Sequence, residues 1–399
     1  MALTLEGVHI IDARGEQPAS RIVLDDGHIL AVGPDVAPAG HRVALDGMLA
    51  LPGFIELHTH GGGGFALHTT DPNEILAYAR WVASTGTTAF VITVVGVPQA
   101  LPIVQLHAAA SAMAQTSQGA EPLGIHLEGP YLNPTRRGAH HPSWLRLPDP
   151  DDVRALLAAA QGQLRLVTLA PELPGAAAAI TQFRDAGVTV SIGHTDATYE
   201  QARDAIAHGI SHATHCFNAM PPLLHRAPGP LGAIIEAKHV TGELIVDGVH
   251  VHPAAARALL YALGAERTVA ITDAQPIAGV AELRGFTFAG QPAEVRDGAA
   301  RLADGTIAGS ILTMDQALRN LVQTLELDLP TASRLLSLNP ARVAGAAERK
   351  GIIAAGYDAD IVLLDKGLCV QATFCRGRLA YVSEEWRERF PAEAAYATH

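Results

Sequence analysis

Five separate segments of this sequence finish on a side chain that can bind a metal ion. The residues are His58 and His60 after FIEL, Glu128 in LGIHLE, His194 in VTVSIGH, His215 in HATH, and Asp273 in TVAITDA. Imidazole nitrogens and carboxylate oxygens together suit a divalent transition metal, and three protein ligands with an open position are typical of a catalytic site. Each residue taken singly also fits a buried hydrogen-bonded histidine, a loop carboxylate or a helix N-cap. Their coincidence at the ends of five similar segments indicates a metal centre.

These segments belong to a set of eight short apolar runs within residues 51–349. The runs cover residues 54–58, 89–95, 123–128, 164–172, 188–194, 212–215, 242–248 and 268–274. Longer amphipathic or Ala-rich stretches separate them, and this alternation is typical of repeated βα units. Eight such units are what a closed (β/α)8 barrel needs, so the predicted fold class is α/β. Because parallel barrel strands end at one face, the metal-binding side chains are expected to converge there.

Both ends of the chain have the pattern of short antiparallel strands. Residues 1–50 alternate apolar and polar positions between turn signals, and the pattern returns in ADIVLLDKG and TFCRGRLAYVSE. We therefore predict one small β domain built from residues 1–50 and 350–383, and a catalytic barrel over residues 51–349. Residues 384–399 form a charged and then Ala-rich tail, to which no function is assigned.

Charge and hydropathy exclude two classes of partner. The formal net charge is -12 and no long basic block is present, so a nucleic-acid partner is not expected. The start, MALTLEGVHIIDARGE, lacks the basic and apolar regions of a secretory signal, and no apolar run reaches the roughly 18 residues needed to span a bilayer. We therefore expect a cytoplasmic protein without a membrane partner.

Two other motifs have structural explanations. Cys216, Cys369 and Cys375 lack C-x-x-C spacing, which argues against a disulfide framework or a thiolate zinc site, and Cys216 is expected to be a buried structural thiol. The run HTHGGGGF lacks the spacing of the nucleotide-binding glycine loops. Its glycines are expected to allow close backbone approach around the site.

The longer blocks around the metal candidates resemble a known family. PGFIELHTHGGGG, GIHLEGPYLNPTRRGAH, IGHTDATYEQA, HATHCFNAMPPLLHRAPG, IVDGVHV, ITDAQPIAG and AGSILTMDQALRNLV stand in the order and spacing seen in the N-acetylglucosamine-6-phosphate deacetylases of the amidohydrolase superfamily. The resemblance covers nearly the whole chain, and the GxHLEGP and HATHxFNAM blocks are its most specific parts. It implies a (β/α)8 barrel flanked by a small β-sandwich domain formed by both chain ends.

The resemblance also implies which residues bind the metal. Glu128, His194 and His215 correspond to the ligands of the principal ion, and His58 and His60 correspond to a second position that some members have lost. Since this chain keeps both histidines, a binuclear centre bridged by Glu128 is expected. The resemblance therefore implies one or two divalent ions, with zinc favoured and iron, manganese or cobalt as alternatives.

Catalytic and substrate-binding roles follow from the same resemblance. Asp273 corresponds to the general acid/base, and His140 to the residue at the substrate carbonyl. The substrate contacts correspond to Asn218, Ala219, Arg226 and His250. A phosphomonoester carries close to two negative charges near pH 7, and a guanidinium is well suited to bind it. In this family the arginine can come from the neighbouring subunit, so a homodimer is implied.

The expected reaction is hydrolysis of the acetamide of N-acetyl-D-glucosamine 6-phosphate to D-glucosamine 6-phosphate and acetate. A deacetylase of N-acetylgalactosamine 6-phosphate is the nearest alternative, because the two sugars differ at one hydroxyl. A hydrolase of cyclic or other N-acyl amides is a further one, although the run at residues 164–172 lacks the lysine that many of those enzymes carboxylate. A metal-free scaffold barrel is the third, but every mapped ligand is retained. His141, Asp196 and Cys216 depart from the family pattern without removing a ligand.

Overall fold

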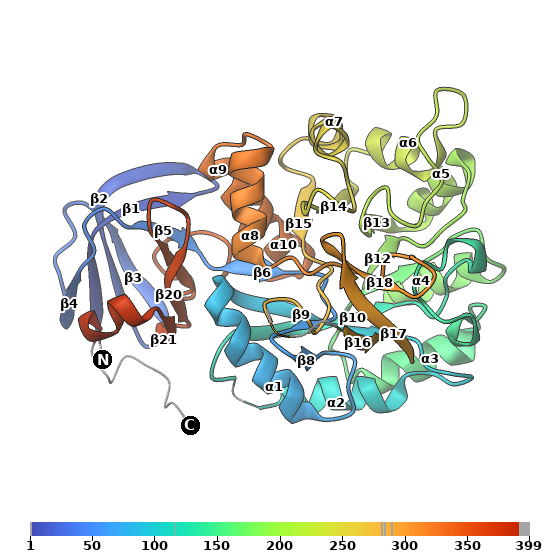
Figure 1. The fold of residues 1–399 in the computed structure, drawn as a ribbon, viewed down its shortest axis with the longest axis horizontal. Helices are drawn as coiled ribbons and strands as arrows, with labels where there is room; N and C mark the ends of the chain where they lie inside the picture. The colour runs from blue at the N-terminus through green and yellow to red at the C-terminus, as the bar shows by residue number, and fades with distance from the viewer. Residues whose placement is uncertain (1, 116, 281, 283–284, 289, 391–399) are drawn as a thin grey trace.

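The structure, a computed structural model, describes residues 2–115, 117–280, 282, 285–288 and 290–390. Its larger part is an eight-stranded parallel sheet in the order β15-β14-β13-β12-β11-β10-β9-β6 (Figure 1). The strands are β6 (Phe54–Glu56), β9 (Thr87–Val95), β10 (Glu121–Glu128), β11 (Leu164–Leu169), β12 (Thr189–Ile192), β13 (Ile210–Ala213), β14 (Thr241–Ile245) and β15 (Thr268–Ile271). Each predicted apolar run overlaps one of these strands.

The sheet closes through the segments that follow its two edge strands. Beyond β15, the Asp273 amide donates to the His58 carbonyl over 2.9 Å, and beyond β6 the His60 amide donates to the Ala274 carbonyl over 2.8 Å. These bonds join the last strand to the first at the carboxyl ends of the strands. The predicted α/β class and (β/α)8 barrel are therefore confirmed.

Helices cover the outside of the barrel, and the local sequence sets where they begin. They are α1 (Pro72–Trp81), α2 (Ile103–Met113), α3 (Pro150–Ala159), α4 (Ala176–Asp185), α5 (Tyr199–His208), α6 (Gly229–Glu236), α7 (Pro253–Leu263), α8 (Met314–Arg319), α9 (Leu329–Ser333) and α10 (Asn339–Val343). Asp71 and Asp149 cap α1 and α3, each of which has proline in its first turn. Thr198 and Gln201 form a reciprocal capping box at the start of α5.

The two ends of the chain share one sheet outside the barrel. Its strands are β1 (Leu3–Asp12), β2 (Gly15–Asp25), β3 (His28–Gly33), β4 (His41–Ala44), β5 (Leu49–Pro52), β19 (Ile361–Leu364), β20 (Val370–Cys375) and β21 (Arg378–Val382). In Figure 1 the blue and red strands of the two ends lie side by side. β5 pairs parallel with β1 and antiparallel with β19, which connects the two ends. The sheet has its own apolar core, to which Phe390 contributes after the short helix η6 (Glu384–Arg389). The rest of the predicted tail, 391–399, lies outside the described residues.

A buried ion cluster connects this sheet to the barrel. The Lys350 ammonium lies 2.8 Å from Glu121 of β10 and 2.8 Å from Asp358, and it also contacts Asp360. Lys350 is only 2% exposed, so these carboxylates have to balance its charge. Burial alone raises the pKa of Glu121, but the hydrogen bond from Arg349 and the charge of Lys350 lower it to about 2.

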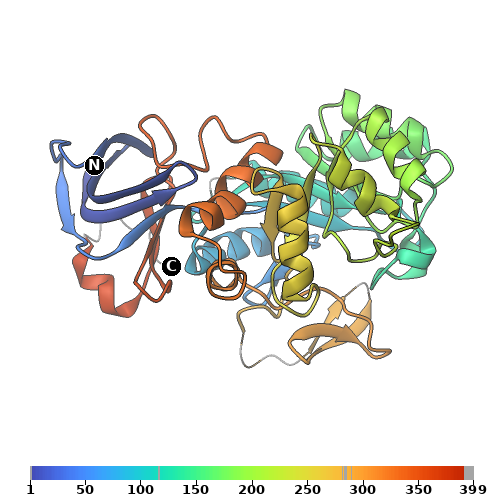
Figure 2. The ribbon, with the colours of Figure 1, turned by 90° about the horizontal axis from the view of Figure 1, so that it is seen from above.

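Between β15 and α8 the chain forms a three-stranded antiparallel sheet that the sequence analysis did not predict. It consists of β16 (Gly285–Phe288), β17 (Gln291–Arg296) and β18 (Ala299–Leu302). Figure 2 shows it in orange, projecting to one side of the barrel. The Gln291 side chain donates to the Ala139 carbonyl over 2.9 Å, which attaches the sheet to the loop after β10. No helix within the described part of the chain is long and apolar enough to cross a bilayer.

Candidate metal centre

Three of the predicted ligands meet at the carboxyl ends of three barrel strands. Glu128 ends β10, whereas His194 and His215 follow β12 and β13. Glu128 Oε1 lies 3.1 Å from His194 Nε2 and 3.4 Å from His215 Nε2, and the two nitrogens are 3.0 Å apart. Ligand atoms bound at about 2.1 Å to one tetrahedral ion lie about 3.4 Å from one another. The three side chains therefore have the spacing of ligands to a single ion.

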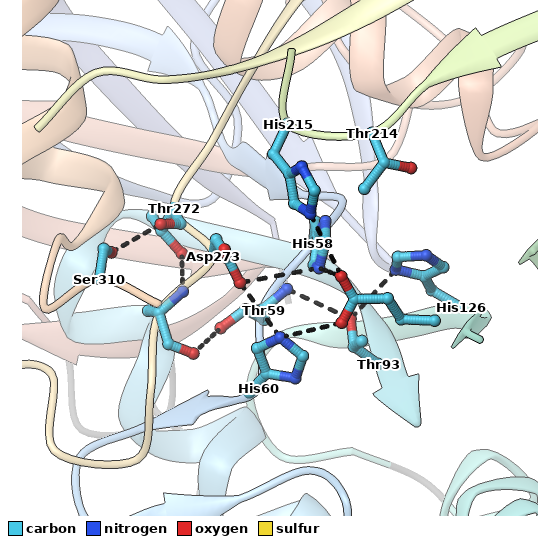
Figure 3. Close-up of polar contacts among 12 residues, drawn as sticks. His58, Thr59, His60, Thr93, His126, Thr214, His215, Thr272, Asp273 and Ser310 are labelled. Carbon is cyan, nitrogen blue, oxygen red and sulfur yellow. Dashed lines mark hydrogen bonds and ion pairs between the residues drawn. The ribbon is translucent and has the colours of Figure 1, made fainter. Parts of the chain in front are cut away.

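A second set of possible ligands lies beside the first. Figure 3 shows His58, His60 and Asp273 converging from the segments after β6 and β15. Asp273 Oδ1 lies 3.1 Å from His60 Nε2 and 3.7 Å from His58 Nε2, and the ligand atoms of this set lie within 4.8 Å of one another. Glu128 lies between the sets, with its Oε1 3.5 Å from His58 Nε2 and its Oε2 3.3 Å from His60 Nε2.

Polar atoms at the centre of this cluster lack, within the described structure, the partners that a cation would supply. Glu128 Oε2, Asp273 Oδ1 and His58 Nε2 are buried and have no hydrogen-bond partner among the described residues. Leaving such groups unsatisfied costs about 1–3 kcal/mol each, and more when they are charged. A divalent cation would satisfy all three, so the residues fit a divalent metal site.

Electrostatics keep the two carboxylates ionised. Burial opposes ionisation, but the charge of His58 and the hydrogen bond with His194 hold the pKa of Glu128 well below its usual range. For Asp273, burial again raises the pKa, while the charges of His58 and His60 lower it to about 2. Burial lowers the pKa of the His140 imidazole more than nearby Glu128 raises it, which favours the neutral ring at pH 7.

The backbone turns sharply at three of these residues. His194, His215 and Asp273 have φ angles of 48°, 27° and 50°, in the left-handed region that non-glycine residues seldom adopt. Each lies just beyond a barrel strand, where the turn sends the main chain outward and leaves the side chain at the centre. Such backbone strain is often found at functional sites.

A cavity opens above the cluster at the carboxyl end of the barrel. Its walls include the predicted ligands and substrate residues His60, Glu128, His140, His194, His215, Asn218, Ala219, His250 and Asp273. His58 lies beneath them and is fully buried. The cavity therefore connects the candidate metal centre to the space in which a substrate would bind.

Comparison with known proteins decides the family. The model of the amidohydrolase family matches residues 49–380, which include the whole barrel. This chain belongs to the amidohydrolase family.

Several characterised proteins are similar to this amidohydrolase over most of their length. The N-acetylgalactosamine-6-phosphate deacetylase of Escherichia coli O157:H7 is 36% identical over 384 residues, covering 95% of this chain and 100% of the relative. The N-acetylglucosamine-6-phosphate deacetylase of Bacillus subtilis is 36% identical over 340 residues, covering 84% of this chain and 85% of the relative. The crystal structure of the N-acetyl-D-glucosamine-6-phosphate deacetylase of Mycobacterium smegmatis has a TM-score of 0.89 and 37% identity, covering 96% of this chain and 100% of that one.

Arg226 is a predicted site residue that a single copy of the amidohydrolase brings neither to the metal candidates nor to the cavity. It lies exposed in the segment between β13 and α6, outside the cavity wall. The neighbouring Leu223 and Leu224 are 46% and 52% exposed. A role for Arg226 in substrate binding therefore requires a second copy of the chain or a movement of this segment.

The cavity of the amidohydrolase also contains residues that the sequence analysis missed. Phe288 of β16 has its ring centroid 5.4 Å from that of His60 and 5.9 Å from that of His140, so the unpredicted sheet covers the ligands. Gln275 lines the cavity, is 1% exposed, and its Oε1 has no partner within the described chain. Its position two residues after Asp273 could have indicated from the sequence that Gln275 lies at the site. No sequence pattern indicated Phe288.

Asp247 is another residue that the analysis missed, and it orients a predicted one. The His250 Nδ1 donates to Asp247 Oδ2 over 2.6 Å. Burial lowers the pKa of His250, but this hydrogen bond and the charge of Asp247 raise it overall. The D-x-x-H spacing in DGVHV was the available signal.

Two structural expectations are confirmed. A Cβ at Gly62 or Gly63 would lie 2.4 or 2.3 Å from the ring of Trp81, so the glycine run does allow close approach, although to a side chain of α1 and not to the metal candidates. Cys216 is buried, as expected of a structural thiol.

Proposed function

We propose that this amidohydrolase removes the acetyl group from N-acetyl-D-glucosamine 6-phosphate, releasing D-glucosamine 6-phosphate and acetate. The observation that carries the proposal is the placement of Asp273 opposite the Glu128, His194 and His215 set, at the floor of one cavity. The similarity to deacetylases of acetamido sugar phosphates, over most of both chains, supports the substrate class.

Glu128, His194 and His215 would hold the principal ion, for which zinc is proposed. His58, His60 and Asp273 would hold a second, with Glu128 between the two positions. A bound divalent ion lowers the pKa of coordinated water to roughly 7 and polarises a carbonyl group.

Asp273 would act first as the general base and then as the general acid. Its ionised carboxylate accepts a proton from the attacking water, whose oxygen forms a bond to the acetyl carbon. The carboxyl group then donates that proton to the sugar nitrogen as the carbon–nitrogen bond breaks. This returns Asp273 to its starting form, so the proton balance closes within one turnover.

His140 would stabilise the developing charge. Its Nε2 lies 3.4 Å from Glu128 Oε2 at the cavity floor, and its neutral ring can donate a hydrogen bond to the carbonyl oxygen. A donor fixed before the reaction costs no reorganisation when the oxyanion forms. Phe288, whose ring centroid lies 5.9 Å from that of His140, would limit the access of bulk water.

The remaining contacts would bind the sugar phosphate. Asn218, Ala219 and His250 line the cavity, and Asp247 holds the His250 ring. Arg226 of a second copy would bind the phosphate, and the exposed Leu223 and Leu224 beside it suit burial in a homodimer interface. A cytoplasmic location is proposed as well, since substrate phosphates of this kind occur inside cells.

An acetate-release assay tests the substrate. Metal-loaded protein would be given the 6-phosphates of N-acetylglucosamine and N-acetylgalactosamine, both unphosphorylated sugars, and an N-acetyl amino acid. The highest kcat/KM is expected for N-acetylglucosamine 6-phosphate. The similarity to the Escherichia coli protein over its whole length makes the galactosamine compound the relevant competitor. A higher value for that compound would reassign the sugar, and no release from either phosphate would refute the proposal.

A further inference from the structure

A buried carboxylate below the candidate metal centre takes no part in the proposed reaction. Glu243 lies on β14 and is fully buried, with its side chain inside the barrel. It belongs to neither set of possible ligands. A charged group in this position is costly unless it is fully hydrogen-bonded, so its partners indicate its purpose.

The partners of Glu243 come from both sets of ligands. Its Oε2 lies 3.0 Å from His58 Nδ1 and accepts a hydrogen bond from the His215 amide over 2.9 Å. Its Oε1 lies 3.1 Å from Nε2 of the buried His212. One carboxylate thus touches a side chain of the second set and the backbone of the first.

The contact with His58 decides where that imidazole carries its proton. An ionised carboxylate only accepts hydrogen bonds, so Nδ1 of His58 has to be the donor. Nε2 faces Glu128 and Asp273, 3.5 and 3.7 Å away, so in the metal-bound neutral ring its lone pair would have the orientation that a metal ligand needs.

Other ligands are held differently. His194 Nδ1 lies 2.9 Å from the carbonyl of Arg136, which is a neutral acceptor. The Nδ1 atoms of His60 and His215 have no partner among the residues described. Among these four imidazoles, His58 alone is oriented by a carboxylate.

We propose that Glu243 is a positioning residue on which occupancy of the second ion position depends, because it holds His58 in the ligating tautomer and orientation. The inference rests on the proposed metal centre. It assigns Glu243 no contact with substrate or with the reacting atoms.

Replacement by glutamine gives a graded effect. The His215 amide can only donate, so the amide oxygen of the new side chain takes the Oε2 position and its nitrogen faces His212. His58 then keeps an acceptor, but one without charge. Loss of such an outer partner typically costs 10–100-fold in metal affinity, and we expect E243Q to lose this much at the second position only. In E243A the His58 ring has no anchor, and the second ion should be lost.

The test is metal titration of the full chain after chelation. Wild type, E243Q, E243A and L244A would be titrated with Co²⁺, with ion content from inductively coupled plasma mass spectrometry and affinities from chelator competition. Leu244 is also fully buried on β14, but its side chain faces the outer helices, so L244A controls for lost packing. Wild type and L244A should bind two ions, and E243A one.

Two results would overturn the inference: wild-type affinity at both positions in E243Q and E243A, or a wild-type protein that binds only one ion. If E243A does not fold, the metal affinity of E243Q at the second position tests the inference, because glutamine preserves the side-chain volume. Acetate release by the wild type is measured separately, so failure of the proposed function would appear there and not in the ion count.

Discussion

Replacing Asp273 by asparagine removes the proposed proton carrier while keeping its shape. Asparagine has nearly the same volume and can still contact His60, whose Nε2 lies 3.1 Å from Asp273 Oδ1. It cannot accept a proton from water or return one to the leaving nitrogen. The principal ligands Glu128, His194 and His215 are untouched. The change therefore separates proton transfer from binding of the principal ion.

The expected loss follows from the role. General acid–base catalysis typically contributes 10²–10⁴-fold, which corresponds to about 2.7–5.5 kcal/mol of transition-state stabilisation. Since one carboxylate serves both proton transfers, kcat of D273N should fall by at least about 100-fold. KM should change little, because His250, Asn218 and Ala219 remain in the cavity wall.

The assay is acetate release under saturating N-acetylglucosamine 6-phosphate, with the ion content of each sample measured in parallel. D196N is the matched control. Asp196 also lies near the end of a barrel strand, but its side chain is 46% exposed and pairs with Arg136 over 2.8 Å. D196N should retain most of the wild-type rate. Turnover by D273N within a few-fold of wild type, at unchanged ion content, would refute the acid–base role.

Three further predictions concern other parts of the molecule. The pKa of Glu121 is about 2 instead of its usual 4.5, so ionised Glu121 stabilises the native state by up to about 3 kcal/mol above pH 4.5, and this stability is lost as the pH falls towards 2. Between pH 7 and pH 3, urea unfolding should therefore show a smaller loss in the free energy of unfolding for E121Q than for wild type. Equal losses in the two proteins would contradict this prediction. R226A should raise KM for the phosphorylated sugar by 10-fold or more without affecting the unphosphorylated one, and an unchanged KM would remove Arg226 from phosphate binding. G63A places a Cβ 2.3 Å from the Trp81 ring at φ +64° and should lower the free energy of unfolding by about 2–4 kcal/mol. G64A, at φ +90° with no described atom within 4 Å of the new Cβ, should lower it by only about 1–2 kcal/mol. Thermal melts compare the two variants, and equal shifts in Tm would argue against the contact with Trp81.

The sequence by itself determined the barrel and the convergence of the candidate metal ligands at one end of it. Apolar runs, helix caps and glycine turns act through local interactions, so they can be recognised without knowing the fold. Parallel strands of a barrel end at one face whatever their order. Placing Glu128, His194 and His215 together therefore required only that each follow a strand.

The tertiary structure alone decided which buried groups meet across the barrel. Glu243 contacts His58, 185 positions away along the chain. The contact exists only because closure of the barrel leaves a single strand, β15, between β14 and β6. Neither residue carries a local signal of the other. Likewise, Phe288 covers the ligands because its small sheet attaches to the loop after β10 through Gln291. Pairing of buried polar and aromatic side chains depends on distances set by the whole fold, and residue order does not encode these distances locally.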